Sequence, residues 1–182
     1  MTTPEPKLKI IIGPMFSGKT SELIRLYQKS YSKKKIIINH SSDKRYTNIP
    51  SITSHDLVSL PATSIEQLTE ILNNKNLLEH EEFYIDEGQF YNDIFDVVKT
   101  LMKFGKKITI CGLDGDFDMK PFGNMDLLRL FPLANNGIIK LYANCYICNA
   151  SASYTKRLVE GNEQKVVGSK DKYQPTCYLH HS

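Results

Sequence analysis

One short segment restricts the possible folds of this chain more than any other. It reads Gly13-Pro14-Met15-Phe16-Ser17-Gly18-Lys19-Thr20 and fits the pattern G-x4-G-K-S/T. A β-branched run at residues 8–12 precedes it, and apolar residues with helical spacing follow it, which argues against a chance glycine turn. This order predicts a strand, a P-loop and a helix, in which backbone N–H groups surround a phosphate at the positive end of the helix dipole. Lys19 would bridge the β- and γ-phosphates of a nucleotide, and Thr20 would give its hydroxyl to Mg²⁺.

Apolar strands alternate with amphipathic helices along most of the chain. We expect strands at residues 8–12, 36–39, 82–85, 107–111 and 138–141, and a loop at residues 41–54. Helices are expected from Glu22 to about Tyr31, after a capping box at Ser64-Ile65-Glu66-Gln67, and after an N-cap at Asn92. Such alternation predicts an α/β fold, a P-loop parallel sheet with helices on both faces. Because the character changes beyond Leu141, we expect a P-loop domain at residues 1–141 and a small subdomain at residues 142–182.

Two adjacent acids end the expected strand at residues 82–85. Asp86 follows the apolar run as the magnesium carboxylate of a Walker B strand does. Glu87 comes next, where an acceptor nucleophile would arrive, and it could take a proton from a hydroxyl or a water. A solvated acidic turn explains the pair equally well when it is taken alone. Together with the P-loop, the pair favours phosphoryl-transfer chemistry.

The C-terminal segment carries two paired-ligand turns. Cys145-x2-Cys148 and Cys177-x2-His180 are separated by 28 residues, a pattern that suits a closed, structural Zn²⁺ site with three thiolates and one imidazole. His181 is the alternative fourth ligand, and unrelated thiols are the alternative to a metal site. Cys111 is expected to be a small buried hydrophobic residue. The remaining histidines, at positions 40, 55 and 80, are expected to be ordinary surface or loop residues.

The charge of the chain gives no reason to expect a polyanionic partner. The 23 Lys and Arg residues against 20 Asp and Glu residues leave a net charge of +3, without a clustered basic face. No apolar stretch is long enough to span a bilayer, and the N-terminal residues contain no secretory signal. We therefore expect a cytoplasmic protein with neither nucleic-acid nor membrane partners, whose four cysteines are metal ligands or buried thiols.

Together these residues resemble one family, the thymidine kinases of the cytosolic and poxvirus type, which are P-loop enzymes with a zinc-bound lasso. The likeness runs from about Lys9 to His180. Its landmarks beyond the P-loop are Asp43-Lys44-Arg45-Tyr46, Asp86-Glu87-Gly88-Gln89-Phe90, Leu113-Asp114-Gly115 with Phe117, Lys120-Pro121-Phe122-Gly123, Ala152-Ser153-Tyr154-Thr155-Lys156-Arg157 and Asp171-Lys172-Tyr173. The resemblance implies transfer of the γ-phosphate of ATP to the 5′-hydroxyl of thymidine, and of deoxyuridine, to give the nucleoside monophosphate.

The resemblance also implies a role for individual residues. Glu87 would be the general base for the nucleoside 5′-hydroxyl. ATP and Mg²⁺ would be bound by the P-loop residues 13–20 with Asp43, Arg45, Asp86 and Gln89. The thymidine site would be lined by Met15, Phe90, Leu113, Phe117, Phe122 and Tyr173, with the base held by the backbone of Gln164-Lys165-Val166-Val167-Gly168. Family members are commonly homotetramers inhibited by dTTP, and both properties become expectations here.

Three positions depart from the common pattern of that family. Tyr91 stands where many members have Phe, Asp116 where Thr is frequent, and His180 where vertebrate members have Cys. None of the three touches the phosphate chemistry.

Two other functions stay open from the residues alone. One is a nucleic-acid-binding ATPase module with a zinc ribbon. The other is a nucleoside monophosphate kinase, which would need an Arg-rich lid that this chain barely offers.

Overall fold

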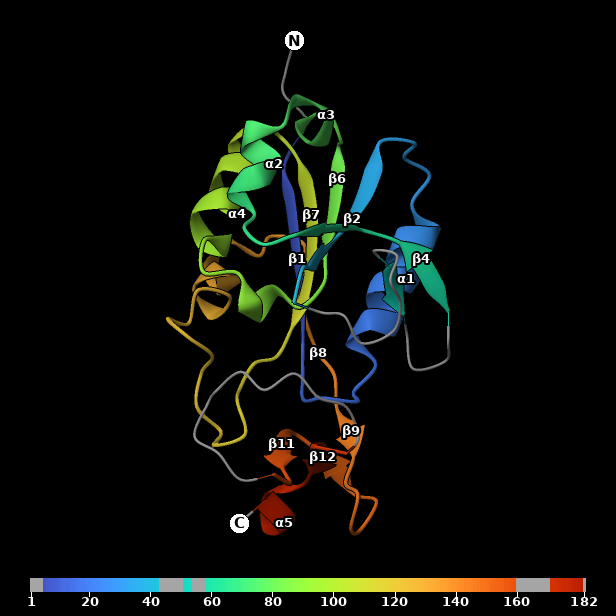
Figure 1. Cartoon of the computed structure of the whole chain (residues 1–182), viewed down its shortest axis with the longest axis vertical. Helices are drawn as coiled ribbons and strands as arrows, with labels where there is room; N and C mark the ends of the chain where they lie inside the picture. The colour runs from blue at the N-terminus through green and yellow to red at the C-terminus, as the bar shows by residue number, and fades with distance from the viewer. Residues whose placement is uncertain (1–4, 43–50, 54–57, 160–170, 182) are drawn as a thin grey trace.

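The computed structural model describes residues 5–42, 51–53, 58–159 and 171–181. Within these residues, six parallel strands form a central sheet in the order β5-β2-β6-β7-β1-β8 (Figure 1). The strands are β1 (Lys7–Ile12), β2 (Lys35–His40), β5 (Thr63–Ile65), β6 (Glu82–Ile85), β7 (Lys107–Gly112) and β8 (Ile138–Lys140). The predicted α/β fold with a parallel sheet is confirmed.

Helices cover both faces of the sheet. Figure 1 shows α1 (Lys19–Lys29) on one side, with α2 (Thr69–Asn73) and α4 (Ile94–Lys103) on the other. Strand β1 contributes to two hydrophobic clusters, one on each face of the sheet. Ile10 packs on the α4 side and Ile11 packs on the α1 side. A strand covered on both faces needs apolar residues at successive positions, which accounts for the unbroken Ile10-Ile11-Ile12 run. A short helix α3 (Lys75–Leu78) follows α2.

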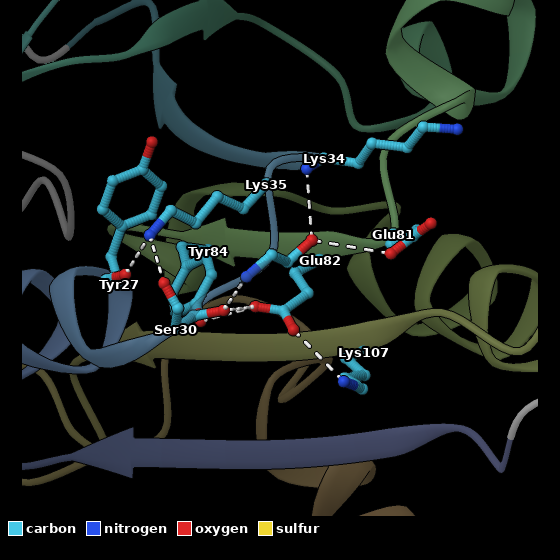
Figure 2. Close-up of polar contacts among 9 residues, drawn as sticks. Tyr27, Ser30, Lys34, Lys35, Glu81, Glu82, Tyr84 and Lys107 are labelled. Atoms are coloured by element: carbon cyan, nitrogen blue, oxygen red, sulfur yellow. Dashed lines mark hydrogen bonds and ion pairs between the residues drawn. The ribbon is translucent and has the colours of Figure 1, made fainter.

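The opposite end of the sheet from the P-loop carries a buried polar network that ties α1 to β6 (Figure 2). Glu82 is buried, and its carboxylate accepts hydrogen bonds from Ser30 Oγ at 2.5 Å, Tyr84 OH at 3.0 Å and Lys107 Nζ at 3.2 Å. Lys35 Nζ donates to the carbonyl oxygens of Tyr27 and Ser30, both at 2.7 Å. This positive charge lies at the negative end of the α1 dipole and so stabilises the helix whose other end follows the P-loop.

Two predicted helix starts are wrong. Ser64 does not open a helix, because Thr63–Ile65 forms strand β5 beside β2 and buries Ile65 in the core. The helix begins at Thr69, whose N–H and hydroxyl both donate to Asp93 Oδ2. Asn92 does not cap α4. The N-cap residue is Asp93, and its carboxylate is directed to Thr69 rather than to its own helix.

The region predicted as a loop at residues 41–54 contains a strand. Strand β3 (Ser51–Thr53) pairs antiparallel with β4 (Ser59–Pro61), and Ile52 is buried on the α1 side of the sheet. Residues 43–50 and 54 of that prediction lie outside the described residues. Two short 3₁₀ helices were also not predicted, η1 (Gly88–Phe90) and η2 (Leu128–Leu133).

The C-terminal residues form small antiparallel ribbons beyond the carboxyl ends of the parallel strands (Figure 1). Strand β9 (Ala143–Asn144) pairs with β10 (Ser151–Ala152), β11 (Tyr154–Arg157) pairs with β12 (Tyr173–Thr176), and α5 (Tyr178–His181) follows. The apolar cluster here is small, consisting of Ala143, Cys145 and Ala152 with Cys177 against it. No helix formed by the described residues has the length and apolar character needed to cross a membrane.

Candidate active site and metal cluster

The P-loop connects β1 to α1 through a backbone that two glycines make possible. A Cβ at Gly13, where φ is 152°, would collide with the Leu141 carbonyl oxygen and lie 2.9 Å from Ser17 Oγ. Gly18 is the N-cap of α1 and has a left-handed φ of 84°. Residues with a side chain rarely adopt these conformations, so both glycines of the motif have a structural reason.

Lys19 reaches back over the loop. Its Nζ donates a hydrogen bond of 2.6 Å to the Pro14 carbonyl oxygen. Burial lowers the pKa of Lys19, while the nearby negative charges, above all that of Glu87, act in the opposite direction. A phosphate group arriving at this loop would compensate the partly desolvated ammonium, which is the electrostatic condition for binding an anion here.

Asp86 lies directly opposite the start of α1. Thr20 Oγ1 donates to its carboxylate at 3.3 and 3.4 Å, and Asp86 is only 4 % exposed. Its Oδ1 atom also accepts from the Glu87 N–H at 3.1 Å and from Cys111 Sγ at 2.7 Å. The structure therefore brings the hydroxyl and the carboxylate of the two predicted nucleotide motifs to one place.

Glu87 occupies a left-handed conformation, with φ of 53°, at the turn after β6. Gln89 Nε2 donates to Glu87 Oε2 at 2.6 Å, and Gln89 Oε1 accepts from the Leu113 N–H at 3.0 Å. A side chain at Gly112 would come within 2.7 Å of Gln89 Oε1, so the glycine leaves room for this bridge. Glu87 is thus held between the ends of β6 and β7 by an amide that touches both.

Aromatic side chains gather beside Glu87. Phe90 meets Phe122 edge-to-face, with ring centroids 6.3 Å apart, and it also meets the ring of His40, with centroids 5.7 Å apart. Phe117 lies 4.0 Å beneath the guanidinium of Arg157. A pocket next to this cluster is lined by Gln89, Tyr91, Leu113, Phe122 and residues of the 123–128 loop. This pocket is small and its lining includes Asn92 and Asp126, whereas the rings of Phe90 and Phe122 offer aromatic contact to a flat, uncharged ring.

The predicted thymidine-site residues fall into two groups. Phe90, Leu113 and Phe122 lie together around the Gln89 amide. Met15, Phe117 and Tyr173 lie where the P-loop meets the C-terminal ribbons. The Met15 N–H donates to Thr155 Oγ1 at 2.9 Å, the guanidinium of Arg157 lies over the Phe117 ring, and Tyr173 is the strand partner of Arg157. Asp43, Arg45 and the segment Gln164-Lys165-Val166-Val167-Gly168 lie outside the described residues.

Tyr91, one of the three departures from the family pattern, is buried against His40. Its hydroxyl has no hydrogen-bond partner within the described part of the chain, and burial raises its pKa above the ordinary value. Asp116, a second departure, is buried and accepts hydrogen bonds from the backbone N–H groups of Asp118 and Lys120, both at 2.9 Å. Asp116 therefore stabilises the backbone of the loop at residues 116–120.

Four side chains converge in the C-terminal ribbons. The ligand atoms of Cys145, Cys148, Cys177 and His180 all lie within 4.8 Å of one another. The Sγ atoms of Cys148 and Cys177 are 3.8 Å apart, and His180 Nδ1 is 3.6 Å from Cys145 Sγ and 3.3 Å from Cys177 Sγ. A tetrahedral zinc site with its usual bond lengths has S···S edges of about 3.8 Å and S···N edges of about 3.5 Å. The donor set and its spacing fit Zn²⁺.

His181, the alternative ligand, lies apart from these four. Its Nδ1 is 3.1 Å from Thr176 Oγ1, and its ring packs on Tyr154 with centroids 5.5 Å apart. The structure thus places His180, and not His181, beside the three sulfurs.

Sequence reasoning missed three contacts at the site. Cys111 is buried as expected, but it also donates to Asp86. His40, expected to be an ordinary residue, packs against Phe90 and Tyr91. Thr155, noted only as part of a landmark motif, binds the P-loop backbone. The position of Cys111 and His40 near the ends of predicted strands could have indicated that they lie at the site, because the carboxyl ends of parallel strands meet at one edge of the sheet.

Comparison with known proteins identifies the family of the chain. The thymidine kinase family model matches residues 6–181. A thymidine kinase of Yaba monkey tumor virus (strain VR587) is 40% identical over 174 residues, covering 93% of this chain and 91% of the relative. Thymidine kinases of Myxoma virus (strain Uriarra) and Vaccinia virus (strain Ankara) are each 37% identical, and each alignment covers 93% of the relative and at least 93% of this chain. The chain therefore belongs to the thymidine kinase family.

Proposed function

We propose that Lys19, Thr20, Asp86 and Glu87 carry out the reaction of this family, transfer of the γ-phosphoryl group of ATP to the 5′-hydroxyl of thymidine. That the chain is a thymidine kinase, an ATP-dependent phosphotransferase, follows from its family and its near-full-length relatives. The residue roles rest on one observation above all. Thr20 Oγ1 lies 3.3 Å from Asp86, and Glu87 follows at the same sheet edge.

Glu87 is the general base in this proposal. Its carboxylate accepts the proton of the 5′-hydroxyl as the oxygen attacks the γ-phosphorus, and ADP leaves on the opposite side. The Gln89 amide keeps the carboxylate at the end of β6. Lys19 and the P-loop N–H groups hold the phosphates and stabilise the charge that develops on the equatorial oxygens. Arg45 near the phosphates and Asp43 belong to the same proposal.

A magnesium ion bound with ATP fits the residues at this edge. Oxygen ligands are what Mg²⁺ prefers, and the Thr20 hydroxyl and the Asp86 carboxylate supply them. Two buried polar atoms nearby, Ser17 Oγ and Asn39 Oδ1, have no hydrogen-bond partner among the described residues, which leaves them available to phosphate oxygens or metal-bound water. When bound, the ion neutralises charge on the β- and γ-phosphate oxygens.

The zinc ion proposed for the C-terminal cluster is structural. Three sulfurs and one imidazole complete a tetrahedron, so no position is left for a substrate. The apolar cluster of this region is small, and a metal would supply the stability that packing lacks. We propose that residues 142–182 form the zinc-held subdomain beside a P-loop domain at residues 1–141. Reduced thiols in a metal site suit a reducing compartment such as the cytoplasm.

The nucleoside would lie between the aromatic cluster and the C-terminal ribbons. Phe90 and Phe122 would contact the base, with Leu113, Phe117, Met15 and Tyr173 around the remainder. The backbone of residues 164–168 would pair with the polar edge of the base, and deoxyuridine would fit the same contacts. The grouping of Phe90 with Phe122 beside Gln89 supports this placement. Assembly as a homotetramer and inhibition by dTTP are further parts of the proposal, carried over from the family resemblance.

A panel of nucleosides incubated with ATP and the purified protein, read as monophosphate product, tests this assignment. Thymidine should give the highest kcat/KM, with deoxyuridine next. Lys19→Ala is the matched control for product made by a contaminating kinase. ADP release stimulated by DNA or by a nucleoside monophosphate, in place of thymidine, would contradict the proposal.

A further inference from the structure

Three neighbouring strands present polar side chains in one row beneath the P-loop. Ile38 of β2 pairs with Ile85 of β6, which in turn pairs with Ile110 of β7. The next position on each strand is Asn39, Asp86 and Cys111. Side chains alternate along a strand, and since the three Ile residues face α4, the three polar residues face α1 and the phosphate loop.

Cys111 makes a directed contact within this row. It is fully buried, and its Sγ lies 2.7 Å from Asp86 Oδ1. An ionised carboxylate can only accept hydrogen bonds, so the thiol is the donor. Oδ1 also takes the Glu87 N–H at 3.1 Å. The turn and β7 thus each supply one donor to Oδ1, and the Thr20 hydroxyl lies near both carboxylate oxygens, 3.3 Å from Oδ1 and 3.4 Å from Oδ2.

We propose that Cys111 is a positioning residue for phosphoryl transfer, whose S–H holds the Asp86 carboxylate in its orientation beside the Thr20 hydroxyl, where the two groups would bind the magnesium ion. The inference rests on the proposed function, in which Asp86 is the magnesium carboxylate. It differs from the expectation that Cys111 merely fills space, because space could be filled by an apolar side chain of similar size. The apolar neighbours of Cys111, such as Ile11 and Leu23, would accept such a replacement.

Substitution separates the hydrogen bond from the packing. Cys111→Ala removes the donor, and Cys111→Ser keeps one. Ile11→Val is the matched control, because Ile11 pairs with Cys111 in register, belongs to the same cluster and makes no polar side-chain contact in the described structure. Removing an outer partner of a metal ligand costs about tenfold or more in metal affinity. We expect Cys111→Ala to raise the Mg²⁺ concentration for half-maximal activity by about tenfold. Cys111→Ser should stay within about twofold of the wild-type protein, as should Ile11→Val.

The effect of Cys111→Ala on Mg²⁺ binding can also be measured without turnover. Calorimetric titration of Mg²⁺ into the zinc-loaded protein with a non-hydrolysable ATP analogue should give the same weakening for Cys111→Ala. The S–H stretching band in the infrared spectrum reports the contact itself. The other three of the four cysteines lie in the metal cluster, where a bound thiol is deprotonated, so Cys111 supplies the S–H band of the loaded protein. Asp86→Ala should move that band toward the frequency of a thiol without an acceptor.

The outcomes separate this inference from the function on which it rests. If Asp86→Asn raises the Mg²⁺ requirement while Cys111→Ala behaves as Ile11→Val does, Cys111 has no positioning role. If Asp86→Asn leaves the Mg²⁺ requirement unchanged, the assignment of Asp86 fails, and the proposal for Cys111 fails with it. If Cys111→Ala does not fold, the band shift in Asp86→Ala and the Cys111→Ser titration still decide. If the frequency of the S–H band is unchanged in Asp86→Ala, the proposal is overturned.

Discussion

Gln89 holds Glu87 in place. The amide nitrogen of Gln89 donates to Glu87 Oε2 at 2.6 Å, and the amide oxygen accepts from the Leu113 N–H at 3.0 Å. One neutral side chain therefore links the turn after β6 to the end of β7. The arrangement fixes the direction of a carboxylate without adding a charge that would compete for its proton.

Glu87→Gln should lower kcat and leave the binding of ATP and thymidine close to that of the wild-type protein. The substitution keeps volume and hydrogen bonding but cannot take up a proton, and base catalysis contributes about 10²- to 10⁴-fold. Steady-state kinetics with separate KM values for both substrates measure the effect. Asp86→Asn is the internal control, since it should instead raise the Mg²⁺ requirement. A Glu87→Gln change of less than about twofold in kcat would remove Glu87 from the mechanism.

Gln89→Leu should lower kcat by about 10- to 100-fold, because the Glu87 carboxylate loses the hydrogen bond from Gln89 that helps to align it for proton transfer. The thymidine KM should change less than kcat does. Asn76→Ala, at an exposed position on α3, serves as the control. Equal kinetics for the two variants would show that the bridge has no part in catalysis.

Lys19→Ala should reduce phosphoryl transfer at least about 100-fold while the protein stays folded, because the ammonium stabilises charge that develops in the transition state. Lys29→Ala is the control, an exposed lysine at the other end of α1. Circular dichroism checks folding, and product formation checks activity. Near-normal turnover of the Lys19 variant would contradict the nucleotide site.

One zinc ion per chain should be found by metal analysis, and Cys177→Ser should release it. The loss should raise the thymidine KM, since the ribbons beside the P-loop lose their metal support. His180→Ala should release zinc in the same way, whereas His181→Ala should retain it, because His181 lies against Thr176. Full activity in a protein with substoichiometric zinc would refute the structural role.

Glu82→Gln should lower the free energy of unfolding by about 1–2 kcal/mol at neutral pH, because the buried carboxylate loses charge-assisted hydrogen bonds. Burial acts to raise the pKa of Glu82, but the hydrogen bonds from Ser30, Tyr84 and Lys107 outweigh it and bring the pKa below the ordinary value of 4.5. A lowered pKa in the folded state means that this stability is fully present above the unfolded pKa and is lost as pH falls through the folded pKa. Urea unfolding at pH 7 and below pH 4 should therefore show the difference between Glu82→Gln and wild type shrinking with acid.

Patterns that are local in the chain predicted the structure well. The run of residues 8–12, the glycine loop and α1 follow one another directly, so periodicity and motif spacing locate all three. The same holds for the paired x2 spacings of the metal cluster. The failure at Ser64 has a different cause. The residues at 64–67 fit a capping box, but β5 pairs with β2 and Ile65 is buried in the core, a contact between distant segments that the local pattern does not encode.

Contacts across the sheet were beyond a single sequence. The hydrogen bond from Cys111 to Asp86 depends on which strands are neighbours, and the order of the strands is not written in their periodicity. The packing of His40 on Tyr91 depends on the same order. The sequence therefore predicts which residues lie at the strand ends, but it does not predict which residues of other strands they contact.

The hydrogen bond from Met15 to Thr155 joins residues 140 positions apart, and so it bears on when the phosphate loop can take its final form during synthesis. The ribosome makes the P-loop first and the ribbon that braces it last, with about 7 to 28 s between them at ordinary elongation rates. Five of the six strands of the sheet, from β2 at residue 35 to β8 at residue 140, are made during that interval. The contact that braces the phosphate loop can therefore form only late in translation, after every strand of the central sheet has been made.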